Sequence, residues 1–248
     1  MKFITITLLL FSFTVVYCRE DRIDSDRPDQ TDGTHVIKPG EVQIESGLYY
    51  NSFEEDDPAF ISSSLLRIGV LNFSELRIIA EEGTRRDVFT EETGHGIYPL
   101  AVGTKVSLLK DHKNLPDISF IGTMQVPITS KTDEKQMKWS PIFNMAYEKE
   151  IWKFSLDVNT GKKWNAFDDG FTYQGTGSLR YEITKKWMSF IEYYGQYSPE
   201  IHPQHNMDGG LIYYVKPNIQ VSASTGTTIF YEDYNRFILI GAAIRLPK

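Results

Sequence analysis

The sequence has almost no cysteine. Its single cysteine, Cys18, ends the apolar stretch with which the chain begins. If that stretch is removed on export, the remaining chain has no thiol, which excludes disulfides, thiolate metal sites and cysteine nucleophiles together. The chain also lacks a block of basic residues, and its formal net charge is -7. Both features argue against nucleic acid as a partner, because phosphates are bound by clustered lysine and arginine.

Long apolar runs are absent beyond residues 3–18. This run follows Lys2 and precedes a charged cluster at residues 19–22, so it has the length and the flanks of a secretory signal peptide. A permanent N-terminal anchor helix is the alternative. Cys18 suggests a lipoprotein, but the bulky Tyr17 stands where lipid attachment requires a small residue. We therefore expect a signal peptide over residues 1–18, with cleavage after Cys18.

A helical period over ten residues or more is also absent. Instead, apolar and polar residues alternate, as in residues 170–183, where Tyr173 and Leu179 share one face and Gln174 and Arg180 share the other. This period of two is typical of a β-strand with two different faces. About twelve such runs follow one another, near residues 41–53, 60–70, 74–82, 98–110, 116–128, 139–148, 151–160, 170–183, 187–197, 207–216, 218–228 and 236–247.

Alternation alone fits two folds, a soluble sandwich with its apolar faces packed together and a barrel with its apolar face in lipid. The connections favour the barrel, because tight ones such as residues 184–187 alternate with long polar ones such as residues 81–98. Aromatic residues gather at both strand ends, as the two interfacial girdles of a membrane barrel require. A mean hydropathy of -0.32 does not contradict this, since only alternate residues would face lipid.

The sequence therefore predicts an all-β fold, a closed antiparallel up-and-down transmembrane β-barrel of about 12 strands over residues 40–248, in the outer membrane of a Gram-negative cell. Closure removes the exposed sheet edges, which lipid does not tolerate. Residues 19–39 are expected to form an N-terminal segment that is either periplasmic or inserted in the lumen. A secreted soluble β-domain is the alternative.

Inward-facing polar residues are the first candidates for function. If the apolar faces look outward, these residues line the lumen and either set a field that sorts solutes by charge or pair across a closed interior. The predicted lumen-lining residues are Glu45, Arg67, Arg77, Lys105, Lys153, Asp157, Gln174, Arg180, Glu182, Glu192, Gln220 and Ser222.

The run "DSDRPDQTDG" places acidic residues around arginine just before the first strand. Clustered carboxylates can bind calcium, but this run lacks the spacing and the distal glutamate of a calcium loop. We expect the segment to fold into the barrel as a plug, with Asp26, Arg27 and Asp29 pairing with charges of the lumen. A disordered segment is the alternative.

The sequence gives little indication of a metal site or a catalytic site. His202, His205 and Asp208 fall in one expected loop, but no further ligand is spaced to complete a zinc site, and His95 is isolated. A lipid-hydrolysing barrel needs a nucleophile beside a histidine, and no such arrangement or G-x-S-x-G run is visible. The sequence thus predicts no catalytic residue, no metal and no cofactor.

An ordered series of segments over roughly residues 25–247 carries a family resemblance. It includes "SDRPDQTDG", "KPGEVQIESGLYY", "LLRIGVLNFSELRI", "PDISFIGTMQVPIT" and "FIEYYGQYSPEIHPQHNMDGGLIYYVKPNIQVSASTG". The series resembles bacterial outer-membrane barrels of the phenol-degradation meta-pathway family, most closely versions from Bacteroidetes. One departure is the ending "IRLPK", where many barrels end on an aromatic residue that is recognised during assembly.

The resemblance implies a transporter-like or porin-like barrel that passes small, hydrophobic or aromatic molecules. Its partners would be outer-membrane lipid, the small-molecule solute and, during insertion, the barrel assembly machinery. Two alternatives stay open: an outer-membrane enzyme acting on lipids, and a non-conducting structural or surface-binding barrel.

Overall fold

The computed structural model describes residues 22–27, 30–52, 58–86, 93–127, 131–132, 138–165, 170–199, 201–230 and 236–246. The expected signal peptide and Asp29 lie outside these residues. Within the described ranges, no helix is long and apolar enough to cross a membrane.

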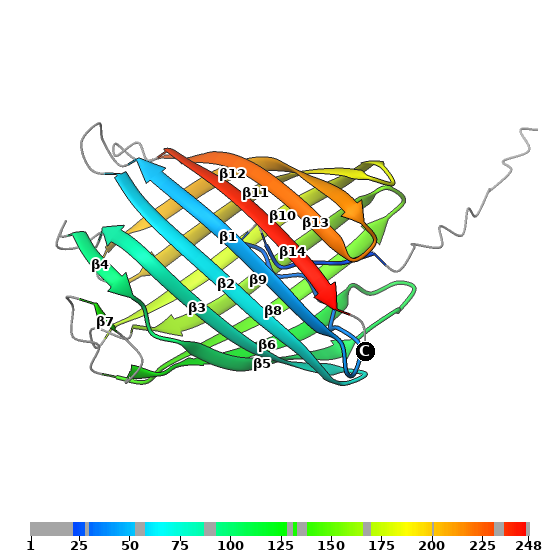
Figure 1. The fold of residues 1–248 in the computed structure, drawn as a ribbon, viewed down its shortest axis with the longest axis horizontal. Coiled ribbons are helices and arrows are strands. Elements are labelled where there is room, and N and C mark those ends of the chain that lie inside the picture. The colour runs from blue at the N-terminus through cyan, green and yellow to red at the C-terminus, as the bar shows by residue number, and fades with distance from the viewer. Residues whose placement is uncertain are drawn as a thin grey trace, which may run out of the picture.

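The described strands form one antiparallel sheet that closes on itself (Figure 1). The first strand pairs with the last, and β2 pairs with β3, so no edge of the long strands is left open. Of the fourteen strands, β4 and β7 are short extensions of the wall, and the other strands make the expected barrel of twelve. The strands are β1 (Val42–Ser52), β2 (Pro58–Leu71), β3 (Ser74–Arg86), β4 (Thr93–Ile97), β5 (Ala101–Leu109), β6 (Asp117–Gln125), β7 (Lys131–Thr132), β8 (Ser140–Ile151), β9 (Phe154–Trp164), β10 (Phe171–Thr184), β11 (Trp187–Ser198), β12 (Ile201–Lys216), β13 (Ile219–Thr228) and β14 (Arg236–Leu246).

The two ends of the barrel differ. Two-residue turns at residues 72–73, 152–153, 185–186 and 217–218 lie at one end, which we call the short-turn end. The barrel wall also begins and finishes there, because Val42 pairs with Leu246. The connection at residues 110–116, between β5 and β6, also lies at this end, whereas the other longer connections between neighbouring strands of the twelve-stranded wall lie at the opposite, long-loop end (Figure 1).

His95 lies on β4, and His202, His205 and Asp208 lie on β12, which corrects the expectation of loops. His205 pairs with Gly195 because the β11–β12 hairpin continues almost to its tip, where Ser198 pairs with Ile201. His95 lies on β4, where its Nδ1 is 3.0 Å from the hydroxyl of Thr84 on β3. Backbone pairing thus extends strands into polar stretches that show no hydrophobic alternation.

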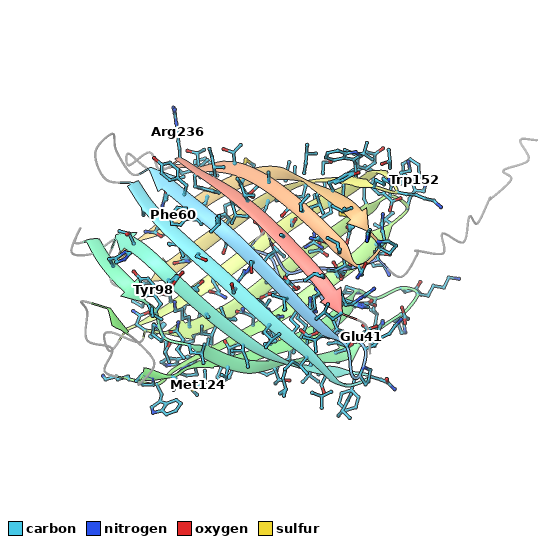
Figure 2. The ribbon with its side chains drawn as sticks, in the orientation of Figure 1. Glu41, Phe60, Tyr98, Met124, Trp152 and Arg236 are labelled. Atoms are coloured by element: carbon cyan, nitrogen blue, oxygen red, sulfur yellow. The ribbon has the colours of Figure 1, made fainter. Side chains whose placement is uncertain are left out.

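The outer face is apolar and exposed. At the middle of β14, Ile240 is 58% exposed, and its partner Leu48 on β1 is 47% exposed. Aromatic side chains lie toward both ends, among them Trp152 at 71% and Trp139 at 60% exposure, and Trp152 and Phe60 are seen near opposite ends in Figure 2. A continuous apolar exterior with aromatic ends fits lipid and not water, so the barrel is an outer-membrane protein and the sandwich is excluded.

Lys162 marks the membrane boundary on the outer face of β9. Its ammonium lies 3.8 Å from the ring centroid of Phe171 and 4.6 Å from that of Trp164. A lysine in this position covers apolar surface with its stem and stabilises its charge on the faces of the rings. The long-loop end of these strands therefore has the chemistry of an interfacial girdle.

Candidate functional site: an occupied lumen

Residues 22–27 and 30–41, which precede β1, run through the interior of the barrel (Figure 1). We call them the inner segment. Its described part has no helix or strand, yet Ile23 is 1% exposed and Thr31 is 0% exposed. A buried irregular chain cannot satisfy its own backbone groups, so the wall must supply hydrogen-bond partners. The polar inner faces of the strands do so.

An apolar contact fixes the start of the inner segment near the short-turn end. Ile23 packs in a cluster that includes Met188, Phe190 and Ile212, and its amide donates to the carbonyl of Pro217 at 2.6 Å. The other side chains of this cluster come from β11, β12 and β14. The lumen is therefore not polar throughout, and the segment enters over a small apolar patch.

Arg22 adds a charged contact at the same end. Its Nη2 lies 2.6 Å from Oε2 of Glu182 on β10, and its guanidinium lies 4.6 Å from the ring centroid of Tyr214 on β12. Glu182, expected in the lumen, is thus beside the inner segment.

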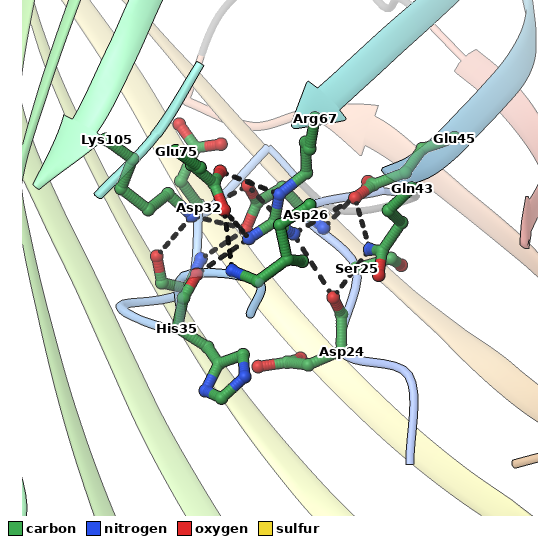
Figure 3. A network of polar contacts seen from close by, with 12 residues as sticks. Asp24, Ser25, Asp26, Asp32, His35, Gln43, Glu45, Arg67, Glu75 and Lys105 are labelled. Carbon is green, nitrogen blue, oxygen red and sulfur yellow. Dashed lines mark hydrogen bonds and ion pairs between the residues drawn. The ribbon is translucent and has the colours of Figure 1, made fainter. Parts of the chain in front are cut away.

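A cluster of opposite charges holds the middle of the segment (Figure 3). One carboxylate oxygen of Asp26 lies 2.5 Å from Nη1 of Arg77, 2.7 Å from Nζ of Lys105 and 3.5 Å from Nη1 of Arg67. Burial alone raises the pKa of Asp26, but the nearby charges of Arg67, Lys105 and Arg77 hold this pKa well below its usual range. Asp26 is therefore a buried carboxylate surrounded by cations.

Two wall carboxylates complete this cluster. Glu75 accepts hydrogen bonds from Nε and Nη2 of Arg67 at 2.7 and 2.9 Å, a two-point contact that fixes the guanidinium plane. Glu45 lies 3.1 Å from Nη1 of Arg67 and also accepts the backbone N–H of Asp26 at 2.9 Å. Each cation of the cluster is thus held in a defined geometry.

The opposite wall is acidic and binds the backbone of the segment. Glu192 accepts the N–H groups of Gln30 and Thr31 at 2.9 and 2.6 Å. Glu148 accepts the hydroxyl of Thr34 at 2.7 Å. Hydrogen bonds from N–H and O–H groups to a carboxylate are shorter and stronger than those between neutral groups.

A tight turn leads the segment out of the lumen into β1. Gly40, at φ 84°, donates its N–H to the carbonyl of Gly69 at 2.9 Å, and Gly69 donates to the carbonyl of Glu41 at 3.0 Å. A Cβ on Gly69 would lie 2.0 Å from the carbonyl oxygen of Lys38. Glycine at residue 69 therefore permits the close approach of the segment to β2.

Most of the residues expected in the lumen are buried on the inner faces of the strands. Gln174 is half-buried and donates to Oδ1 of Asn144 at 2.7 Å. Lys153 lies in the turn after β8, where it lines a small pocket with Arg180 and Glu182. The buried members of the set are Glu45, Arg67, Arg77, Lys105, Asp157, Arg180, Glu192, Gln220 and Ser222.

The N-terminal residues behave differently from one another. Asp26 is at the centre of the charge cluster, whereas Arg27 contributes its carbonyl, which lies 3.4 Å from the side-chain amide of Gln220. Within the described residues, Nε of Arg27 is buried without a hydrogen-bond partner. Asp29 falls outside the described residues.

Glu75 and Glu148 also contact the inner segment, and sequence reasoning missed them. Glu75 is two residues from Arg77 and therefore on the same face of β3. That parity signal was present in the sequence. Their partners were not readable, because residues 34 and 37 are brought to them only by the path of the inner segment.

An aromatic group lies on the inner wall toward the long-loop end. The rings of Tyr49 and Phe237 stack with centroids 5.3 Å apart, and the ring of Tyr194 lies 6.1 Å from that of Phe237. Asn51 and Asp208 are buried on the same inner faces. This part of the lumen offers both ring surfaces and polar groups.

Comparison with known proteins gives one family and a set of similar folds. The model of the family described as "Putative MetA-pathway of phenol degradation" matches residues 25–246. Among curated proteins, no match was found.

Several solved structures have a similar fold. An outer membrane channel from Pseudomonas putida F1 aligns with a TM-score of 0.69 at 11% identity, over 88% of this chain and 100% of that one. The NanC porin aligns at 0.59 with 9% identity, over 82% of this chain and 100% of that one. The KdgM porin, solved in complex with disordered oligogalacturonate, aligns at 0.56 with 11% identity, over 82% and 98%. At these identities the likeness is one of fold.

Proposed function

The chain belongs to the family described as "Putative MetA-pathway of phenol degradation", and we propose that it is a channel through which small molecules cross the outer membrane. We further propose that the inner segment is a plug that closes the lumen and must move for solute to pass. The twelve-stranded barrel encloses an interior lined by polar side chains, which suits passage, and the inner segment occupies that interior.

The observation that carries the proposal is how the inner segment is held. Its described contacts with the wall are mainly hydrogen bonds and ion pairs, such as those of Thr31 with Glu192 and of Asp26 with Arg77. Water can replace such partners when the segment leaves, whereas a segment packed through apolar surface would expose that surface. Its buried apolar residues are few among those described, namely Ile23 in the apolar cluster and Val36 and Ile37. The segment therefore has the chemistry of a removable closure.

The aromatic group of Tyr49, Tyr194 and Phe237 supports hydrophobic or aromatic solutes. Offset and edge contacts between rings stabilise an aromatic guest beyond simple burial. The family description names phenol degradation, which fits the same class. Lipid around the outer face and the barrel assembly machinery during insertion are the partners that this function requires.

We propose no enzymatic role. His205 is the histidine that a lipid-facing active site would need, since it lies on the outer face of β12. In the described part of the chain, its Nδ1 is 2.6 Å from the hydroxyl of Tyr193, and its ring packs edge-on against Phe230 at 6.0 Å. These neighbours are aromatic side chains, and they do not form the arrangement of a nucleophile beside a general base that hydrolysis requires.

Conductance in a planar bilayer tests the proposal. Wild type should show a low conductance with rare openings, and Ile23→Asp should open more often because it places a carboxylate in the apolar patch that fixes the plug. Ile240→Leu on the outer face is the matched control. A band whose gel migration changes on heating shows that each variant is a closed barrel. Closed barrels that conduct in none of these forms would leave the non-conducting structural barrel, and lipid hydrolysis would favour the enzyme.

A further inference from the structure

Three cations from adjacent strands converge on one point of the inner wall. Arg67 on β2 pairs in register with Arg77 on β3, and Lys105 lies on the next strand, β5. All three side chains reach the carboxylate of Asp26 within 3.5 Å. Guanidinium and ammonium donors in this arrangement match the oxygens of a carboxylate. The wall thus holds a preformed carboxylate site, and Asp26 occupies it.

The charge balance shows what the site needs when the segment leaves. Arg67, Arg77 and Lys105 carry three positive charges, and the wall supplies two negative ones from Glu45 and Glu75, which leaves one positive charge. Asp26 cancels it. A buried excess charge is costly, so the vacated site must take water or an anion.

Lys105 shows this dependence most clearly. Its ammonium, 0% exposed, donates to Oδ1 and Oδ2 of Asp26 at 2.9 and 2.7 Å and to the carbonyl of Gly33 at 2.8 Å. All three described hydrogen bonds go to the inner segment. Removal of the segment would therefore leave this ammonium facing the lumen with its donors available.

We infer that Arg67, Arg77 and Lys105 form a binding site for the carboxylate of a small organic anion, and that Asp26 is a built-in competitor for it. The inference rests on the proposed function, because it requires the inner segment to leave. Solute and segment cannot occupy the site together, so an anion that binds only the open state shifts the equilibrium from the closed state to the open state. The solute would then promote its own passage.

The test uses the full chain with Cys18→Ser and a reporter thiol at Ser25→Cys, next to Asp26. Ser25 is buried, so a thiol there reacts only when the segment leaves. Benzoate, benzyl alcohol and benzylamine serve as probes with one ring and different charge. Saturating benzoate should raise the labelling rate by at least about tenfold, which requires that benzoate bind the open state about tenfold more tightly than the closed state. The two other probes should have little effect.

Two further variants separate the site from the closure. Lys105→Gln should raise basal labelling, because Asp26 loses a partner, and should abolish the response to benzoate. Lys162→Gln, which removes a lysine from the outer wall, should retain that response. Asp26→Asn removes the charge of the competing carboxylate, so the segment should leave the site more readily and this variant should bind benzoate directly and more tightly than wild type.

The outcomes separate the two proposals. Equal responses to benzoate and benzyl alcohol, or a full benzoate response in Lys105→Gln, would overturn the anion site. So would the absence of benzoate binding in Asp26→Asn. If Ile23→Asp conducts but benzoate has no effect, the channel stands and the anion site is wrong. If benzoate drives labelling but no form conducts, the anion site stands and the channel is wrong.

Discussion

Glu192→Ala is the sharpest single test of how the inner segment is held. Glu192 is buried on β11 and accepts the backbone N–H groups of Gln30 and Thr31 as well as the hydroxyl of Thr31. The substitution removes the acceptor of both N–H groups when the segment is seated, where the hydrogen bond of Thr31 is buried and that of Gln30 is half-buried. When the segment is out, water hydrates them, so the loss falls on the seated state alone.

The magnitude follows from these two backbone hydrogen bonds. A hydrogen bond to a charged group contributes about 1.5–3 kcal/mol net. Two of them give about 3 kcal/mol as a lower figure, which corresponds to a rise of roughly 100-fold in the ratio of unseated to seated protein. Glu192→Gln keeps one acceptor oxygen and should raise this ratio only about tenfold.

The assay is the labelling rate of a thiol at Ser25→Cys in a Cys18→Ser chain, with open time in planar bilayers as a second measurement. The order expected is Glu192→Ala, then Glu192→Gln, then wild type. A closed, heat-modifiable barrel in which Glu192→Ala labels no faster than wild type would show that these hydrogen bonds do not hold the segment.

Three other predictions concern the wall and the closure. Ile240→Arg, at the middle of the outer face of β14, should lower the free energy of unfolding in vesicles by about 2–4 kcal/mol, whereas Leu156→Arg, close to the turn before β9, should cost about 0–1 kcal/mol; equal costs would contradict the placement of the membrane. The pKa of Asp26 lies well below its usual range, so the stabilisation that Asp26 gives to the seated segment is complete above that range and is lost only as the pH falls through the lowered value. The labelling rate should therefore not change between pH 8 and pH 5, once it is divided by the rate of the same thiol in the unfolded chain, which corrects for ionisation of the thiol. Gly69→Ala, whose Cβ would meet the carbonyl of Lys38 at 2.0 Å, should speed labelling and lower the temperature of the gel shift, whereas Gly175→Ala, whose Cβ would have no neighbour within 4 Å among the described residues, should leave both unchanged.

The barrel was readable from the sequence because its signal is local. In β14, Ile238 and Ile240 alternate with Phe237 and Leu239, and their exposure alternates in the same way. A period of two is imposed by the strand itself, so it appears in sequence whatever the neighbouring strands are. The tight turns beside aromatic residues then indicated which face meets lipid. The strand ends were less readable, because the pairing of His205 with Gly195 depends on the partner strand and not on local alternation.

What the tertiary structure alone decided is which charge meets which. The sequence placed Arg67, Arg77 and Lys105 on inner faces and Asp26 in a segment expected to pair with charges of the lumen, but it did not say which ones, and Lys105 and Asp26 are separated by 79 residues. Their contact depends on closure of the barrel and on the path of the inner segment through it, and neither leaves a periodic trace in the chain. The sequence by itself determined a wall with a polar inside and an apolar outside, since each strand carries that pattern alone. Only the closed barrel brought three cations from neighbouring strands onto one carboxylate, because distance in space between charges is set by strand register and not by sequence separation.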